Sequence, residues 1–356
     1  MNNTITLKAL DTESSVNFTN NSFYGLHIIL YLTNIFDSKV QNNILISENI
    51  TQIKSTMDTI GITGTIEIDN NLFISKNSNQ PVIGIGTEAS AVSYGKLNGS
   101  IIKNNRILCP GYFNNDPGMQ HGIFIYANSV EAYYNYLNGC NLGYVIKQTG
   151  DLSYVAKIHH NISENCKGNF YLAKGSPGTV FVNNIGILNK NISDVIFVEL
   201  MADTGYAGSY SSECVVKNNL FINNGNIEDL HFIQTTTNDD SGLSCDNNLY
   251  FKKGQVNTIH ARVSLANKTF AEWQALGYDT HSIVLTTEQY NALFTDSDND
   301  DYSLKAGSIA IGAGTDLGAA YDDGLDASTD WGSDTSVPVV VTKQQAATWD
   351  CGAYVS

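Results

Sequence analysis

The chain has 356 residues and a formal net charge of −16 at pH 7, with 42% hydrophobic and 15% charged residues. The negative charge disfavours nucleic acid and anionic membrane as partners, because both carry charge of the same sign. No run reaches the roughly 18 consecutive apolar residues that a transmembrane helix needs. Residues 1–6 also lack the basic and apolar regions of a signal peptide, so no signal peptide is predicted in this sequence.

A pair of asparagines followed by a short apolar run recurs from Asn20 to Phe251. The complete copies begin at Asn20, Asn42, Asn70, Asn104, Asn183, Asn218 and Asn247, and weaker copies lie at Asn135 and His160. Successive copies are about 22 to 35 residues apart, the period of a solenoid. Asparagine tolerates the left-handed backbone conformation of a tight turn, and stacked side-chain amides can form a ladder. The pairs are therefore predicted to be structural.

Two further apolar runs accompany each asparagine pair. One type is seen at residues 122–126, 143–147 and 169–173, and the other, which precedes the pair, at residues 179–182 and 213–217. Short runs rich in β-branched residues and bounded by Gly, Asn and Ser are typical of strands. Three short strands in each coil predict an all-β parallel β-helix.

The pattern stops after Phe251. Residues 269–277 and 286–294 each predict a short helix that begins at a threonine cap. We therefore divide the chain into β-helix coils at 1–251, a helical excursion at 252–296 and a C-terminal cap at 297–356. The six cysteines lack metal-ligand spacing and are predicted to be small apolar residues inside the coils.

Three C-terminal segments, FAEWQALGYDTHS, DYSLKAGSIAIGAG and WDCGAY, resemble the signature of right-handed parallel β-helix proteins of the pectate-lyase-like superfamily. Ile309 stands where that signature usually has proline, and Cys351 where it has an apolar residue. The resemblance implies a right-handed, single-stranded β-helix closed by a C-terminal cap with short helices. It leaves function open, because the superfamily includes polysaccharide lyases, glycoside hydrolases, epimerases, tailspikes and binding proteins.

When the coils are aligned, side chains that can transfer protons or carry charge fall on one face. Tyr126, Lys147, Lys174 and Glu199 fall at or near strand ends in four consecutive coils, and His121 precedes the first of these strands. A polysaccharide lyase needs a base, an acid and positive charge beside a uronate carboxylate. We therefore predict His121, Tyr126, Lys147 and Lys174 as catalytic residues. The alternative is that the lysines only extend along the surface while Tyr126 packs against the next coil.

Substrate binding is assigned to aromatic and polar residues beside this row. They are Tyr112, Phe113, Glu199, Tyr206 and Gln234. A glycoside hydrolase would need paired carboxylates, and neither Asp194 nor Glu164 clearly converges with Glu199.

No metal site is predicted. The acidic turn at 296–301 lacks the glycine and the final glutamate of a calcium loop, so it is interpreted as a solvated turn, with calcium retained as a candidate cofactor. His159 and His160 are predicted to point to opposite faces, with His160 in an asparagine slot of the turn.

Taken together, the sequence predicts a carbohydrate-active protein that binds an extracellular polysaccharide and cleaves it by lyase-type β-elimination. The alternative is a non-catalytic glycan-binding, tailspike-like or adhesin-like module. The expected partner is a polysaccharide, and the expected state is a monomer, or a homotrimer for a tailspike-like protein. The expected location is extracellular or on a virion surface.

Overall fold

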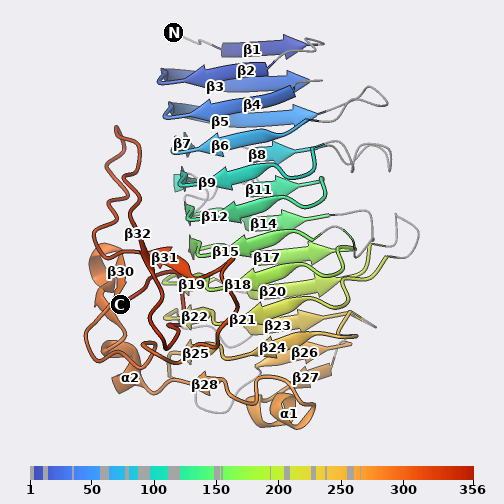
Figure 1. Ribbon diagram of the computed structural model, residues 1–356, viewed down its shortest axis with the longest axis vertical. Helices are drawn as coiled ribbons and strands as arrows, with labels where there is room; N and C mark the ends of the chain where they lie inside the picture. The colour runs from blue at the N-terminus through green and yellow to red at the C-terminus, as the bar shows by residue number, and fades with distance from the viewer. Residues whose placement is uncertain are drawn as a thin grey trace.

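The computed structural model describes residues 4–10, 15–33, 36–56, 64–76, 80–86, 97–110, 121–147, 153, 155–192, 194–203, 209–225, 230–236, 239–254, 260–264 and 266–356. Strands stack in parallel along the long axis of the molecule, from β1 at one end to β28 at the other (Figure 1). The predicted all-β parallel fold is confirmed. No helix in the described part of the chain is long and apolar enough to cross a lipid bilayer.

The pairing of strands defines three parallel ladders. The first ladder precedes the asparagine turns and contains β2 (Ser15–Thr19), β4 (Phe36–Gln41), β6 (Ile66–Asp69), β9 (Ile101–Lys103), β12 (Glu131–Tyr133), β15 (Lys157–His159), β18 (Val180–Val182), β21 (Val215–Lys217) and β24 (Ser244–Asp246).

The second ladder follows the turns. It contains the first parts of β3 (Ser22–Thr33) and β5 (Ile44–Thr56), then β7 (Leu72–Ser75), β10 (Arg106–Leu108), β13 (Tyr136–Asn138), β16 (Ile162–Glu164), β19 (Ile185–Leu188), β22 (Leu220–Asn223), β25 (Leu249–Lys252) and β28 (Ile283–Val284).

The third ladder completes each coil. It contains β1 (Thr4–Leu10), the later parts of β3 and β5, then β8 (Pro81–Ile85), β11 (His121–Ile125), β14 (Leu142–Ile146), β17 (Asn169–Lys174), β20 (Ile196–Met201), β23 (His231–Thr235) and β26 (Ala261–Val263). The short strand β27 (Ala266–Lys268) pairs with β26 in antiparallel fashion.

The two asparagines of each pair have different tasks. The first residue adopts the left-handed conformation, with φ of 55° at Asn70 and 56° at Asn104, and His160 takes the same conformation at 52°. The second asparagine carries the predicted ladder, since Asn71 donates from its backbone N–H and its Nδ2 to Oδ1 of Asn105, at 3.1 and 2.9 Å. These bonds satisfy buried amides that would otherwise destabilise the turn.

The interior is filled by side chains that stack from coil to coil. Phe170, Phe197 and Phe232 form one such stack, with ring centroids 4.4 and 5.3 Å apart. All six cysteines are buried and free, as the sequence predicts. Matching shapes in successive coils keep the strands in register, because a slip of one residue would turn the apolar side chains outward.

The ladders extend past residue 251, since β26 and β28 continue the third and second ladders. The predicted helices are α1 (Phe270–Ala275) and α2 (Thr287–Asn291), and each begins with a capping box, at Thr269 and Thr286. Trp273 of α1 is fully buried against the last coil. Helix α1 therefore closes this end of the solenoid, while Tyr290 of α2 stacks on Phe251 of β25.

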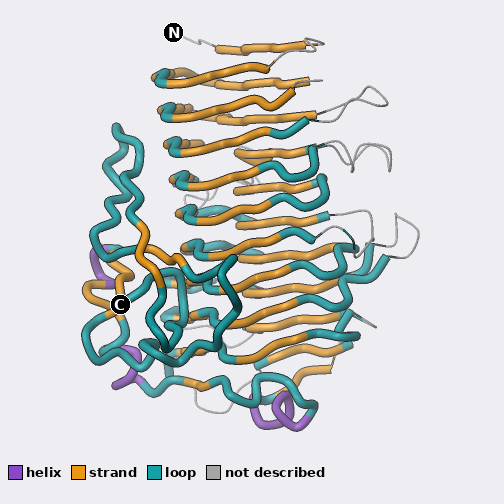
Figure 2. The backbone as a smooth tube through the Cα atoms, viewed as in Figure 1, coloured by secondary structure: helices purple, strands orange, loops and turns teal. Residues whose placement is uncertain are grey.

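The C-terminal segment contains β29 (Phe294–Asp296), the 3-10 turn η2 (Ser297–Asn299), β30 (Asp301–Leu304), β31 (Asp323–Leu325) and β32 (Thr342–Gln344). It runs back along one side of the coils (Figures 1 and 2). Leu325, Ala353 and Tyr354 pack on Ile185 and Leu220 of the second ladder. The segment therefore covers the outward side of that ladder around Ile185 and Leu220, while β14, β17, β20 and β23 of the third ladder lie clear of the segment in Figure 1.

Candidate functional site

Tyr126, Lys147 and Lys174 occupy equivalent positions in three successive coils of the third ladder. The preceding residues Ile125, Ile146 and Ala173 are paired in register, so the three side chains follow one another along the solenoid axis. Neighbouring strands lie about 4.8 Å apart. We call Tyr126, Lys147 and Lys174 the Tyr–Lys row.

Lys147 lies in the middle of the row and is largely enclosed. Its Nζ is 3.9 Å from Oδ2 of Asp203 and 5.7 Å from the ring centroid of Tyr126. The side chains of Lys147 and Asp203 are only 10% and 9% exposed. A buried ammonium requires such a partner, because isolated charges are strongly disfavoured away from water. Asp203 thus fixes the position of the positive charge next to Tyr126.

Lys174 is half-buried and stands beside Met201 of the next coil. Its ammonium makes no ion pair with any residue in the described ranges. Of the two lysines in the row, Lys174 is therefore the one whose charge is better suited to meet an anionic ligand.

Glu199 and Gln234 lie on a neighbouring line. Leu172, Glu199 and Gln234 are paired in register, so Glu199 is two residues, or about 7 Å along the strand, from the position aligned with Lys174. The Glu199 carboxylate accepts hydrogen bonds from Asn169 Nδ2 and Gln234 Nε2, both at 2.6 Å. The three side chains form a polar bridge across three coils.

His121 begins strand β11, while Tyr126 follows the end of that strand. At about 3.3 Å per residue the two are separated by roughly 16 Å, so His121 does not converge with the Tyr–Lys row. Its ring stacks on Phe124 with centroids 4.7 Å apart, and burial lowers its pKa to about 4. His121 is therefore neutral at pH 7. Its buried Nδ1 has no hydrogen-bond partner among the described residues.

The remaining predicted binding residues, Tyr112, Phe113 and Tyr206, lie outside the described residues. Sequence reasoning did not assign roles to Asp203 and Asn169. The available signal for Asp203 was an acidic residue two positions after the end of strand β20, close to the end of the row.

His159 and His160 meet, although they were expected to point apart. Their Nδ1 atoms are 2.9 Å apart, and Nε2 of His159 is 3.1 Å from Oε1 of Glu131. The left-handed conformation of His160 breaks the alternation of the strand and turns its ring back. Burial lowers the pKa of both rings. The ring of Tyr321 from the C-terminal segment packs edge-on against His159, which suits a structural role.

Within the described ranges, no three His, Cys, Asp or Glu side chains gather as metal ligands would. In the acidic turn, Asn299 Nδ2 donates to Oδ2 of Asp296 at 2.8 Å, and Asp300 adopts a left-handed conformation. The turn thus uses its own polar groups for local hydrogen bonds.

No family model matches the sequence, and no curated protein matches it. A functional assignment must therefore come from the chemistry of the residues themselves.

Proposed function

We propose that the chain binds an extended, negatively charged polysaccharide across the third ladder and cleaves it by β-elimination. The observation that carries this proposal is the register of Tyr126, Lys147 and Lys174 on three successive coils. A spacing of about 4.8 Å allows one uronate unit to contact more than one coil. Such polymers occur outside cells, so we place the protein extracellularly or on a virion surface.

Each residue of the row has a role in this reaction. Lys174 neutralises the uronate carboxylate, which makes the neighbouring C–H group more acidic. Tyr126 removes that proton, helped by the ammonium of Lys147, because positive charge favours a phenolate. The glycosidic C–O bond then breaks as a C=C bond forms, and the leaving oxygen takes back from the Tyr126 hydroxyl the proton that Tyr126 removed. Asp203 acts as a positioning residue through Lys147.

The Glu199 bridge serves a neighbouring sugar unit, whereas His121 lies roughly 16 Å from Tyr126 along the strand, beyond the reacting unit. His121 is neutral at pH 7, and we assign its ring to the part of the binding face around Phe124. Glu199 and Gln234 offer a carboxylate and an amide about two residues along the strand from the row. These groups suit binding, since proton transfer requires direct contact with the reacting atom.

One observation favours a non-catalytic alternative. Lys147 is almost fully enclosed and paired with Asp203, as expected of a lysine that holds coils together. In that case the ladder would bind a glycan without cleaving it, as a tailspike-like or adhesin-like module does. Measurement of mass in solution separates a monomer from the homotrimer of a tailspike-like protein.

A panel of uronate polymers tests the proposal. Polygalacturonate, alginate and glycosaminoglycans are incubated with the protein, and the ultraviolet absorbance of an unsaturated uronate product is followed. We expect a rise on at least one polymer. Retarded migration in a polymer-containing gel without any rise in absorbance would favour the non-catalytic alternative. Neither binding nor product on any polymer would contradict both.

A further inference from the structure

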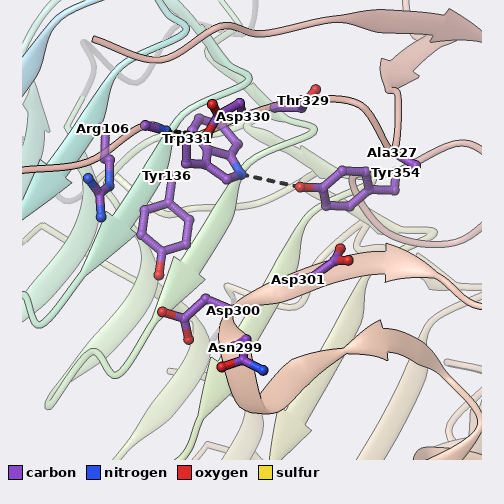
Figure 3. Close-up of a pocket in the computed structure, with 11 residues that line it drawn as sticks. Arg106, Tyr136, Asn299, Asp300, Asp301, Ala327, Thr329, Asp330, Trp331 and Tyr354 are labelled. Carbon is purple, nitrogen blue, oxygen red and sulfur yellow. Dashed lines mark hydrogen bonds between the residues drawn. The ribbon is translucent and has the colours of Figure 1, made fainter. Parts of the chain in front are cut away.

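A cavity lies between the C-terminal segment and the second ladder, away from the Tyr–Lys row. Its volume is about 310 Å³, and three distant parts of the chain line it. Arg106 and Tyr136 come from β10 and β13, Asn299 and Asp300 from the turn around η2, and Trp331 from the C-terminal segment (Figure 3). The cavity exists only because the chain folds back over its own coils.

Trp331 forms the exposed aromatic wall of this cavity, and the ring of Tyr136, which is only 3% exposed, packs against it. The rings of Trp331 and Tyr136 have centroids 5.4 Å apart and planes inclined by 34°. Trp331 Nε1 donates to the Tyr354 hydroxyl at 3.2 Å, and the Tyr136 hydroxyl donates to Oε2 of Glu164 at 2.6 Å. Both rings are thus held by hydrogen bonds, so a ligand would not have to order them on binding.

The rest of the lining is strongly polar. Asp300, Asp301 and Asp330 contribute three carboxylates, against one guanidinium from Arg106. The Arg106 side chain is only 16% exposed, and its Nη1 lies 3.5 Å from Oδ1 of Asp334, while its buried Nε has no hydrogen-bond partner among the described residues. A buried donor without a partner is unfavourable, and a ligand hydroxyl could satisfy it.

An aromatic wall facing carboxylate, amide and guanidinium groups has the chemistry of a sugar site. The apolar C–H face of a pyranose packs on an aromatic ring, while its hydroxyls bond charged and amide groups. The excess of carboxylates disfavours a uronate, which would bring a further negative charge. We propose that this cavity binds a single pyranose unit that carries no carboxylate. The proposal is independent of the lyase activity and of the Tyr–Lys row.

Tryptophan fluorescence gives a direct test on the whole chain. Trp273 and Trp349 are buried, whereas Trp331 is half-buried and lines the cavity. We expect saturable fluorescence changes with methyl glycosides of neutral hexoses, and none with the matching methyl uronides. Binding of uronides alone, or no binding of any probe, would overturn the proposal. Binding of a tetraalkylammonium ion without binding of any sugar would also overturn it, because the cavity would then be a cation site.

Two aspartates give a matched pair of variants. Oδ1 of Asp330 accepts from the Gly332 N–H at 2.8 Å, and Oδ1 of Asp316 accepts from the Gly318 N–H at 2.7 Å. Both aspartates are exposed, but only Asp330 lines the cavity. Asp330→Asn should weaken sugar binding about tenfold through loss of a charge-assisted hydrogen bond. Asp316→Asn should leave it unchanged, and an equal effect of both variants would contradict the site.

Trp331→Ala removes the aromatic wall of the cavity. It also removes the fluorescent residue that reports binding, so sugar binding to this variant is measured by calorimetry. We expect complete loss of sugar binding with circular dichroism unchanged. Unaltered affinity in this folded variant would place the sugar elsewhere. If Trp331→Ala does not fold, the comparison of Asp330→Asn with Asp316→Asn decides the question alone.

Discussion

Lys147 Nζ lies 3.9 Å from Oδ2 of Asp203, and this enclosed pair joins the ends of β14 and β20, which lie on either side of β17. Removing one partner leaves the other buried and charged, so Asp203→Asn and Lys147→Met should each destabilise the fold by about 3 kcal/mol. The double variant should be less destabilised than the sum of the two. A double-mutant cycle from denaturant unfolding measures this coupling, and strictly additive effects would show that the pair does not interact.

The two asparagines of one turn should respond differently to the same change. Asn105→Ala removes buried bonds to Asn71 and Asn135 and should cost about 3 kcal/mol or more. Asn104→Ala chiefly forces alanine into a left-handed conformation, at about 1–2 kcal/mol. The unfolding free energies of the two variants test whether the two asparagines have these different structural roles. Equal losses would contradict it.

Stability should fall in mild acid in part because of His121. Burial lowers its folded-state pKa to about 4, below the unfolded value of 6.5, so the unfolded chain binds the proton first. The free energy of unfolding therefore begins to fall as the pH drops below 6.5 and continues to fall to about pH 4, by up to about 1.4 kcal/mol per pH unit.

The variant His121→Phe tests this effect, because phenylalanine keeps the stacking on Phe124 without titrating. Thermal unfolding at pH 7 and pH 5 should show a smaller acid-induced drop in Tm for this variant than for the unaltered chain. The exposed His281 is the control position, through His281→Asn. If His121→Phe and the unaltered chain lose the same Tm on acidification, His121 is not a source of the pH dependence.

The repeating part of the fold could be predicted from the sequence because its signals are local. In most coils the left-handed turn residue and the ladder amide are both asparagine, so the pair marks the coil, and Tyr134 and His160 take the first position in two others. The alignment of Tyr126, Lys147 and Lys174 followed from counting along adjacent coils of similar pattern.

The position of Glu199 shows where this counting fails. Strands β18 and β19 lie between Lys174 and Ile196, and the lengths of the segments that connect them do not fix where β20 pairs with β17. Stacking of Phe170 on Phe197, at 4.4 Å between centroids, accompanies a register in which Leu172 pairs with Glu199. Such packing depends on the shapes of buried side chains, which a strand pattern alone does not give.

Contacts between the C-terminal segment and the coils could not be predicted from the sequence. Trp331 meets Tyr136 only because the C-terminal segment runs back over the second ladder. Nothing near either residue in the sequence encodes that path. The cavity between them therefore became visible only in three dimensions.

The rate of unsaturated-product formation by Lys174→Met tests the central claim most directly. Lys305→Met, at an exposed lysine of the cap, is the control. On a uronate polymer that the unaltered chain cleaves, the account predicts a loss of at least about 100-fold in kcat/KM for Lys174→Met, with Tm unchanged and the control fully active. Retention of kcat/KM within about twofold by a folded Lys174→Met protein would contradict the proposed site.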